Sequence, residues 1–193
     1  MILMNNKFFE KYFETRNDTL KDITSNSNEW NKFINYWARI LDNYSVDNII
    51  NLYSYNPYGN VFMTFDEWNS DKIDRRIKPK SKGIPIMVDN HKIYVFDIKQ
   101  TYGKDYKIWK YNHFMDNLIL DYYQSQIKVK YNNEKSLFQN YYDTFYEISL
   151  KQIMDNYKDL SVDEVEFVTK TMTSLFLSKS NFNISRFPML TTY

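Results

Sequence analysis

Six basic side chains crowd into residues 72–82, a stretch that we call the basic segment. They are Lys72, Arg75, Arg76, Lys78, Lys80 and Lys82, and the segment holds one acid, Asp74, so its net charge is +5. The whole chain carries only +1, so the residues outside the basic segment sum to −4. Cations at this density attract phosphates or another polyanion. The basic segment therefore predicts an anionic partner.

Aromatic residues stand close to the basic segment in the sequence. Tyr58, Phe62 and Trp68 precede it, and such rings can stack on unpaired bases, which is worth about 1–3 kcal/mol per base. Rings and cations together favour salt-dependent, sequence-tolerant binding of single-stranded nucleic acid. The alternative is a solvated turn with Trp68 in the core, and for Trp68 itself the sequence favours burial over stacking. Both interpretations remain open at this point.

Residue types that carry catalysis or bind metals are scarce. The chain has no Cys, which excludes thiolate chemistry, and its two His, His91 and His113, are isolated from each other, so there is no His-Glu-x-x-His zinc site. Its carboxylates mostly stand near expected helix starts, where they interact favourably with the helix dipole. The pair Lys82-Gly83 has too few glycines for a phosphate-binding loop. We therefore predict no enzymatic activity, no metal and no cofactor.

Several polar residues stand where a ligand or a turn would use them. Asp97, Gln100 and Thr101 follow an expected strand, and we assign them to organising the turn at its end. His91 falls in an expected hairpin turn and His113 near an expected helix start. Surface or packing roles are predicted for both.

Helix-start signals place structural elements around the basic segment. Asn26 or Ser27 is expected to cap a helix, and Ser45 to cap the next one. The first of these helices should bury one face, formed by Trp30, Phe33, Ile34, Trp37, Ala38, Leu41 and Tyr44. Thr64 and Glu67 have capping-box spacing, which predicts a short helix that carries Trp68. Residues 84–88 and 93–98 flank an Asp-Asn-His turn and predict a β-hairpin, to which residues 61–63 can add a third strand.

After Gly103 the pattern becomes helical again. Apolar residues at 114–119 and 137–148 predict helices, and Ser161 with Glu164 opens a last one. The buried face of that last helix is expected to be Val165, Val168, Met172, Leu175 and Phe176. The predicted fold class is α+β, a small antiparallel sheet of about three strands packed by N- and C-terminal helices. We expect residues 1–106, with the basic segment, and the helical residues 107–193 to form one compact domain.

Three stretches of the sequence resemble the N-terminal domain of ArdC-type antirestriction proteins. They are Thr64-x-x-x-Trp68, Lys82-Gly83-Ile84-Pro85-Ile86 and Val95-Phe96-Asp97-Ile98-Lys99-Gln100-Thr101. The form Thr-Phe-Asp-Glu-Trp is most similar to the version at the front of LtrC-like proteins of Firmicutes phages and mobile elements, and the similarity spans roughly residues 30–180. The resemblance implies a domain that binds single-stranded DNA and protects incoming DNA from host nucleases. The metallopeptidase-like domain of ArdC proteins has no counterpart in this sequence.

The charge and the resemblance together predict an anti-defence protein, either anti-CRISPR or antirestriction, of a phage or mobile element. Its expected partners are a DNA-targeting nuclease, such as a CRISPR effector or a restriction enzyme, and single-stranded DNA or guide–target nucleic acid. The predicted contact residues are the six cations of the basic segment with Tyr58 and Trp68. The alternative is a sequence-nonspecific single-stranded DNA-binding module that protects transferred DNA without touching a nuclease.

The sequence also bears on the compartment. Its start is too short and too soon charged for a signal-peptide core, and no apolar run reaches the ~18 residues that span a bilayer. The absence of Cys fits a reducing compartment. We expect a soluble protein in the cytoplasm of a bacterial host, without a membrane partner.

Overall fold

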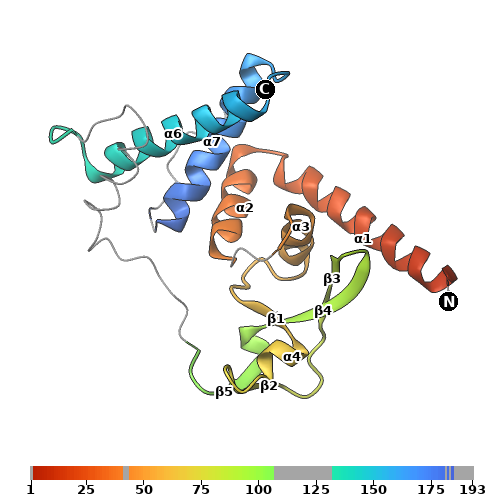
Figure 1. The fold of residues 1–193 in the computed structure, drawn as a ribbon. Coiled ribbons are helices and arrows are strands. Elements are labelled where there is room, and N and C mark those ends of the chain that lie inside the picture. Colours follow the sequence, from red (N-terminus) through yellow and green to blue (C-terminus); the bar gives the residue numbers. More distant parts are fainter. Residues whose placement is uncertain (1, 41–43, 107–131, 181, 183, 185–193) are drawn as a thin grey trace. The chain divides into compact units, whose positions relative to one another are not determined.

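The computed structural model describes residues 2–40, 44–106, 132–180, 182 and 184, and it divides the chain into two compact units (Figure 1). Unit 1 is Met1–Ile108 and unit 2 is Trp109–Tyr193. The described elements are helices with small antiparallel sheets, so the predicted α+β class is confirmed. Leu41, His113 and the helix expected at 114–119 lie outside the described residues. The packing of the C-terminal helices on the sheet stays a prediction.

Unit 1 begins with three helices, α1 (Ile2–Ile23), α2 (Ser27–Arg39) and α3 (Val46–Tyr55). The predicted caps are confirmed: the Asn26 side chain accepts from two backbone amides at the start of α2, and Ser45 accepts from one at the start of α3. These acceptors satisfy amides that have no partner within the helix. The long helix α1 was not among the elements expected from the sequence.

The buried face of α2 differs from the predicted one. Tyr36 is fully buried, whereas Trp37 and Ala38 are only half-buried. Helix α2 ends at Arg39, so Tyr44 lies beyond it, and its hydroxyl donates to the Phe62 carbonyl at 2.6 Å. Tyr36 and Trp37 are adjacent aromatic residues, and the packing of α2 against its neighbours, rather than the apolar pattern, determines which ring is inside.

The main sheet has three antiparallel strands, β1 (Phe62–Thr64), β3 (Ile84–Val88) and β4 (His91–Asp97), in the order β1-β4-β3. Phe62 pairs with Asp97, and Val88 pairs with His91. Asp89 and Asn90 connect β3 to β4 with φ of 49° and 62°, the left-handed backbone that a two-residue hairpin turn requires. The predicted hairpin and third strand are both confirmed.

Helix α3 covers the outer edge of β3 with two asparagines. Asn48 accepts from the Met87 amide at 2.9 Å and donates to the Met87 carbonyl at 2.7 Å. Asn51 donates to the Pro85 carbonyl at 2.7 Å. An edge strand leaves such backbone groups unpaired, and these side chains form the hydrogen bonds that a further strand would otherwise form.

A second, two-stranded sheet was not predicted. Its strands are β2 (Arg75–Ile77) and β5 (Thr101–Gly103), which pair antiparallel. We call this pair the ribbon. The basic segment is therefore not simply a turn between a helix and a hairpin, because its middle residues form a strand. Figure 1 shows α2 and α3 above the main sheet, with the short helix α4 (Phe65–Trp68) and the ribbon below it.

The capping box of α4 is confirmed. The Glu67 carboxylate accepts from the Thr64 amide at 2.7 Å, and the Thr64 hydroxyl accepts from the Glu67 amide at 3.3 Å. This fixes the direction in which the chain enters α4 and places Trp68 at its inner side.

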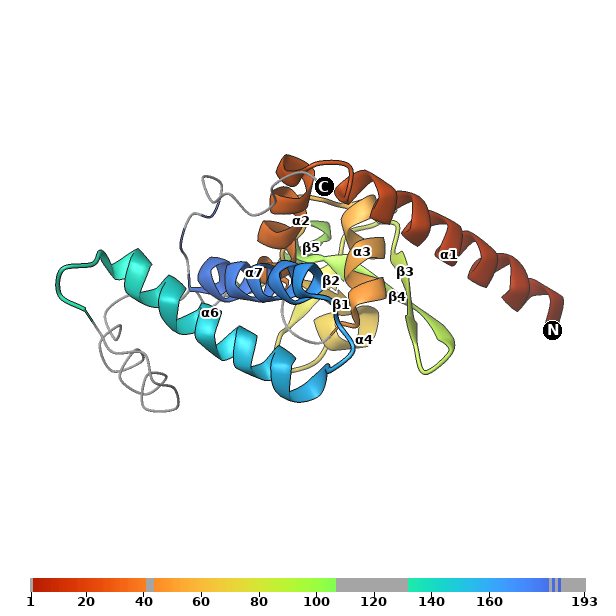
Figure 2. The same cartoon turned by 90° about the horizontal axis from the view of Figure 1, so that it is seen from above.

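Unit 2 contains α6 (Leu137–Asn156) and α7 (Val162–Lys179), which lie side by side in Figures 1 and 2. The predicted capping box of Ser161 and Glu164 is confirmed. The predicted buried face of α7 is wrong in detail: its five apolar residues are half-buried, whereas Thr169, Thr173, Ser174 and Leu177 are fully buried. Thr173 and Ser174 donate to carbonyls of their own helix at 2.7 and 2.9 Å, so these small polar groups tolerate burial.

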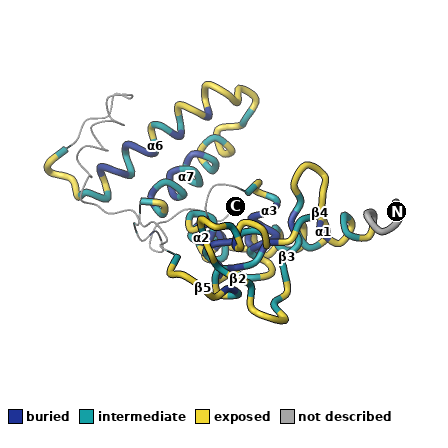
Figure 3. The backbone as a smooth tube through the Cα atoms, turned by 60° about the horizontal axis from the view of Figure 1, so that its bottom comes forward, coloured by how far each residue is buried: buried dark blue, intermediate teal, exposed yellow. Residues whose placement is uncertain are grey.

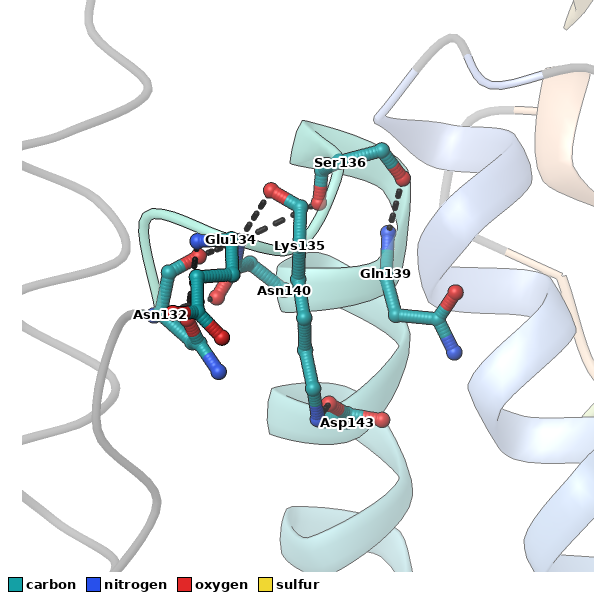
Figure 4. Close-up of polar contacts among 7 residues, drawn as sticks. All are labelled: Asn132, Glu134, Lys135, Ser136, Gln139, Asn140 and Asp143. Atoms are coloured by element: carbon teal, nitrogen blue, oxygen red, sulfur yellow. Dashed lines mark hydrogen bonds and ion pairs between the residues drawn. The ribbon is translucent and has the colours of Figure 1, made fainter.

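The side chain of one asparagine forms hydrogen bonds with the loop that leads into α6 (Figure 4). Asn140 accepts from the Asn132 amide at 2.8 Å and donates to the carbonyls of Asn132, Lys135 and Ser136 at 3.0 to 3.3 Å. Lys135 also forms an ion pair of 2.6 Å with Asp143. The entry loop and the first turns of α6 are thereby joined.

Candidate nucleic-acid interface

The ribbon gives the basic segment two distinct sides. Arg76 pairs with Tyr102, and Ile77 pairs with Thr101. Side chains alternate along a strand, and paired residues share a face. Arg76 and Tyr102 are therefore together on the outer face, where Tyr102 is 52% exposed, whereas Thr101 is buried on the inner face. Figure 3 shows the chain around β5 as largely exposed.

Arg75 points to the inner face and holds the ribbon together. Its Nε donates to the Thr101 hydroxyl at 2.8 Å, Nη2 donates to the Thr101 carbonyl at 3.4 Å, and Nη1 donates to the Lys104 carbonyl. These bonds engage all three guanidinium nitrogens. Arg75, predicted to contact the partner, is thus bound within the ribbon, and its role as a contact residue stays a prediction.

The chain after β2 continues along the same side as Arg76. The Lys78 amide donates to the Gln100 carbonyl at 2.8 Å, which extends the ladder by one residue. Alternation then places Lys78 on the outer face, and its ammonium group reaches the Lys99 carbonyl at 2.7 Å. Gln100 donates to the Lys82 carbonyl at 3.0 Å, so the turn that carries Lys80 and Lys82 is held against the end of β4.

Tyr58 and Lys99 adjoin this face. The Lys99 ammonium group donates to the Tyr58 carbonyl at 3.3 Å, and the Tyr58 ring is 75% exposed. Arg39 donates to the carbonyl of Pro57, the residue before Tyr58, at 3.3 Å. We call the resulting set the ribbon surface: Tyr58, Arg76, Lys78, Lys80, Lys82, Lys99 and Tyr102.

The ribbon surface carries five cations. Within the part of the chain that the structure describes, none of them forms an ion pair with a carboxylate. Asp74, the acid of the basic segment, is paired with Lys104 at 2.9 Å, and the hydrogen bond and charge of Lys104, with a smaller effect of Arg76, lower the pKa of Asp74. Lys72 is exposed in the turn between α4 and β2, and no described contact joins it to the ribbon surface.

Trp68 is a correction to the predicted contact residues. It is fully buried, its indole donates to the Phe96 carbonyl at 2.9 Å, and its ring meets Tyr106 edge-on at 5.8 Å. Phe62 is buried as well. Neither ring can stack on a base, because α4 and β1 turn both of them into the core. The exposed rings of the ribbon surface are those of Tyr58 and Tyr102.

The polar residues at the end of β4 have the structural role predicted for them. Asp97 is fully buried, and its carboxylate accepts from the amides of Asn60 and Lys99 at 3.1 and 2.8 Å. Gln100 completes a capping box with Asp97, and the Thr101 hydroxyl donates to the Ile98 carbonyl at 2.8 Å. His91 is exposed and its ring contacts the Asp89 carbonyl.

Lys99 and Tyr102 were not predicted as part of this surface, because their position beside the basic segment depends on strand pairing. Both follow β4 in the sequence, and the pattern there predicts only the end of a hairpin. The pairing of residues 75–77 with residues 101–103 brings them beside the basic segment. A signal existed in the alternation of Thr101, Tyr102 and Gly103, but three residues are too few to identify a strand.

Two classes of site have no support among the described residues. No group of three or more His, Cys, Asp or Glu there is arranged to hold a metal ion. None of the helices in the described ranges is long and apolar enough to cross a bilayer. What the ribbon surface offers is positive charge and exposed rings, without an arranged nucleophile or general base.

No known protein family, curated protein or solved structure matches the chain.

Proposed function

We propose that the chain binds single-stranded nucleic acid through the ribbon surface. The observation that carries the proposal is the outer face of the ribbon, where Arg76 and Lys78 stand beside the exposed Tyr102 and, among the described residues, form no ion pair with a carboxylate. Cations along a narrow face match a phosphate backbone, and tyrosine rings match unpaired bases. Duplex bases are stacked on one another, so exposed rings favour a single strand.

The binding is expected to tolerate any sequence. Lysine ammonium groups meet phosphates as point charges, and a ring can stack on every base. The ribbon surface as defined contains no asparagine or glutamine, the side chains that read the edge of adenine. Five cations that each neutralise one phosphate would give a salt slope of about −3.5 on a log–log plot.

A charge-reversal pair tests this function. In fluorescence anisotropy with a labelled single-stranded oligonucleotide, Arg76→Glu with Lys82→Glu is expected to weaken binding at least tenfold. Lys151→Glu with Lys158→Glu is the matched control, because both lysines are exposed in unit 2 and the charge change is equal. Equal affinity of the two variants would remove the ribbon surface from the interface.

The biological use that we infer for this binding is anti-defence. The chain would act in the cytoplasm of a bacterial host and inhibit a DNA-targeting nuclease by engaging the nuclease, its nucleic acid or both. The support is the concentration of charge in the basic segment and the resemblance of residues 64–101 to ArdC N-terminal domains. The alternative use is shielding of transferred DNA without any contact to a nuclease.

The two uses predict different results for binding to the nuclease in the absence of DNA. A pull-down of purified, guide-loaded Cas nuclease or of a restriction enzyme, with and without target DNA, measures whether the protein itself is bound. Capture together with blocked cleavage supports inhibition of the nuclease. Binding only to bare single strands supports the shielding role.

A further inference from the structure

Unit 1 contains a second concave site, built from residues outside the ribbon surface. It is a cavity of about 580 Å³ between α1, α3 and the β3–β4 hairpin. Volumes of roughly 300–1,000 Å³ are typical of small-molecule sites. Its lining residues are Lys7, Phe8, Lys11, Tyr12, Asn51, Tyr55, Pro85 and Lys92.

Three lysines give this cavity a positive charge. Lys7 and Lys11 are one turn apart on α1, and Lys92 comes from β4. The Lys92 ammonium group lies 4.8 Å from the centre of the Phe8 ring and 4.7 Å from that of Tyr94. No acidic residue is among the lining residues, and within the described ranges none of the three lysines forms an ion pair. The cavity therefore favours an anionic ligand.

A buried acceptor in the cavity wall has no partner. Asn51 is 1% exposed, and its Nδ2 donates to the Pro85 carbonyl. This bond fixes the orientation of the amide, since the opposite orientation would set two acceptors against each other. The Oδ1 atom is buried and accepts no hydrogen bond from any described residue. Because this atom exposes almost no surface, a ligand in the cavity cannot reach it, so Asn51 is a fixed structural part of the wall.

We propose that this cavity binds a nucleotide. The lysines hold the phosphate, and the rings of Phe8 and Tyr55 pack on the base. A free mononucleotide and one nucleotide of a bound single strand share this chemistry. The proposal uses none of the residues of the ribbon surface, so it stands or fails separately from the proposed function.

Calorimetric titration of the full chain with three ligands tests the chemistry. The deoxyadenosine monophosphate dAMP is expected to bind at least tenfold more tightly than deoxyadenosine, which lacks the phosphate, and than inorganic phosphate, which lacks the base. Absence of dAMP binding at millimolar concentration, or equal affinity for dAMP and inorganic phosphate, would overturn the proposal.

Variants locate the binding in the cavity. Lys11→Glu with Lys92→Glu is expected to lower dAMP affinity at least tenfold, with circular dichroism verifying the fold, because both side chains are exposed. Lys151→Glu with Lys158→Glu is the matched control, and Arg76→Glu with Lys82→Glu is expected to keep dAMP affinity within twofold. A loss in the ribbon variant instead of the cavity variant would place the nucleotide elsewhere and contradict the proposal. If the cavity variant also binds an oligonucleotide more weakly, the natural source is a strand; if only dAMP binding falls, it is a free nucleotide.

Discussion

The orientation of single side chains determines which charged groups and rings the ribbon surface exposes. Arg75 and Arg76 are adjacent, yet one guanidinium group is bound inside the ribbon and the other is exposed beside Tyr102. Trp68 precedes the basic segment closely, yet it belongs to the core. Sequence proximity to a cluster of charge is therefore a poor guide to contact, because strand alternation and helix packing send neighbours in opposite directions.

Gly103 is the residue on which the ribbon depends most. Its φ is +138°, and a Cβ atom there would lie 2.6 Å from the Asp74 carbonyl oxygen. Gly103→Ala is expected to destabilise the ribbon by about 1–3 kcal/mol and to weaken oligonucleotide binding. Hydrogen exchange of the amides of β2 and β5 measures the first effect. Unchanged exchange in both strands would show that the alanine is accommodated.

Tyr36 makes the protein sensitive to alkaline pH. Burial, and next the charge of Asp97, raise the pKa of the Tyr36 hydroxyl, and burial with Asp47 raises the pKa of Tyr12 to about 12. Both groups are neutral in the folded protein and ionise more readily in the unfolded one. Their contribution to stability is therefore complete below pH ~10 and is lost as the pH rises toward 12 and beyond.

Tyr36→Phe tests this account, because the Tyr36 hydroxyl is buried and bonds to no described residue. The variant is expected to be as stable as the wild type at pH 7, or more stable, since an unsatisfied buried hydroxyl costs about 1–3 kcal/mol. It is also expected to lose less stability than the wild type in urea melts between pH 9 and pH 11. A large loss at pH 7 would mean that the hydroxyl is hydrogen-bonded.

Elements are joined in unit 1 by one buried amide. Asn48 accepts from the Tyr12 hydroxyl of α1 at 2.7 Å and bonds both backbone groups of Met87 in β3. The asparagine therefore ties α1, α3 and the hairpin together, and these are the same elements that form the lysine-lined cavity.

Asn48→Ala is expected to cost about 3 kcal/mol, because the buried Tyr12 hydroxyl and the two part-buried backbone groups of Met87 all lose this partner. Thermal or urea unfolding measures the loss, and Asn133→Ala, at an exposed position of unit 2, is expected to stay within about 0.5 kcal/mol of the wild type. Similar stabilities of the two variants would contradict the assignment of Asn48 as a link between elements.

The accuracy of the sequence predictions also varies with the scale of the interaction. Ser45, Thr64 with Glu67, and Ser161 with Glu164 were predicted as caps because a cap is decided within four residues. The β3–β4 hairpin is local too. The pairing of β2 with β5 joins segments of three residues that are distant in the sequence, and segments so short do not identify a strand or its partner. The cavity beside Asn51 depends on α1, a helix that was not predicted from the sequence.

At the scale of the whole molecule, charge is distributed unevenly on a nearly neutral chain. A net charge of +1 gives little long-range attraction to a polyanion, so binding has to come from local concentrations of cations. Unit 1 has two of these, the ribbon surface and the cavity lined by Lys7, Lys11 and Lys92. The account therefore predicts strand binding that is strongly sensitive to salt.

The most direct test of the central claim is the salt dependence of single-strand affinity, measured by anisotropy with the wild type and with Arg76→Glu, Lys82→Glu. The wild type is expected to show a log–log slope of about −3.5, and the variant a slope shallower by about 1.4, since two phosphate contacts are lost. Equal slopes for the two proteins, or an affinity that does not change with salt, would contradict the assignment of the ribbon surface as the nucleic-acid interface.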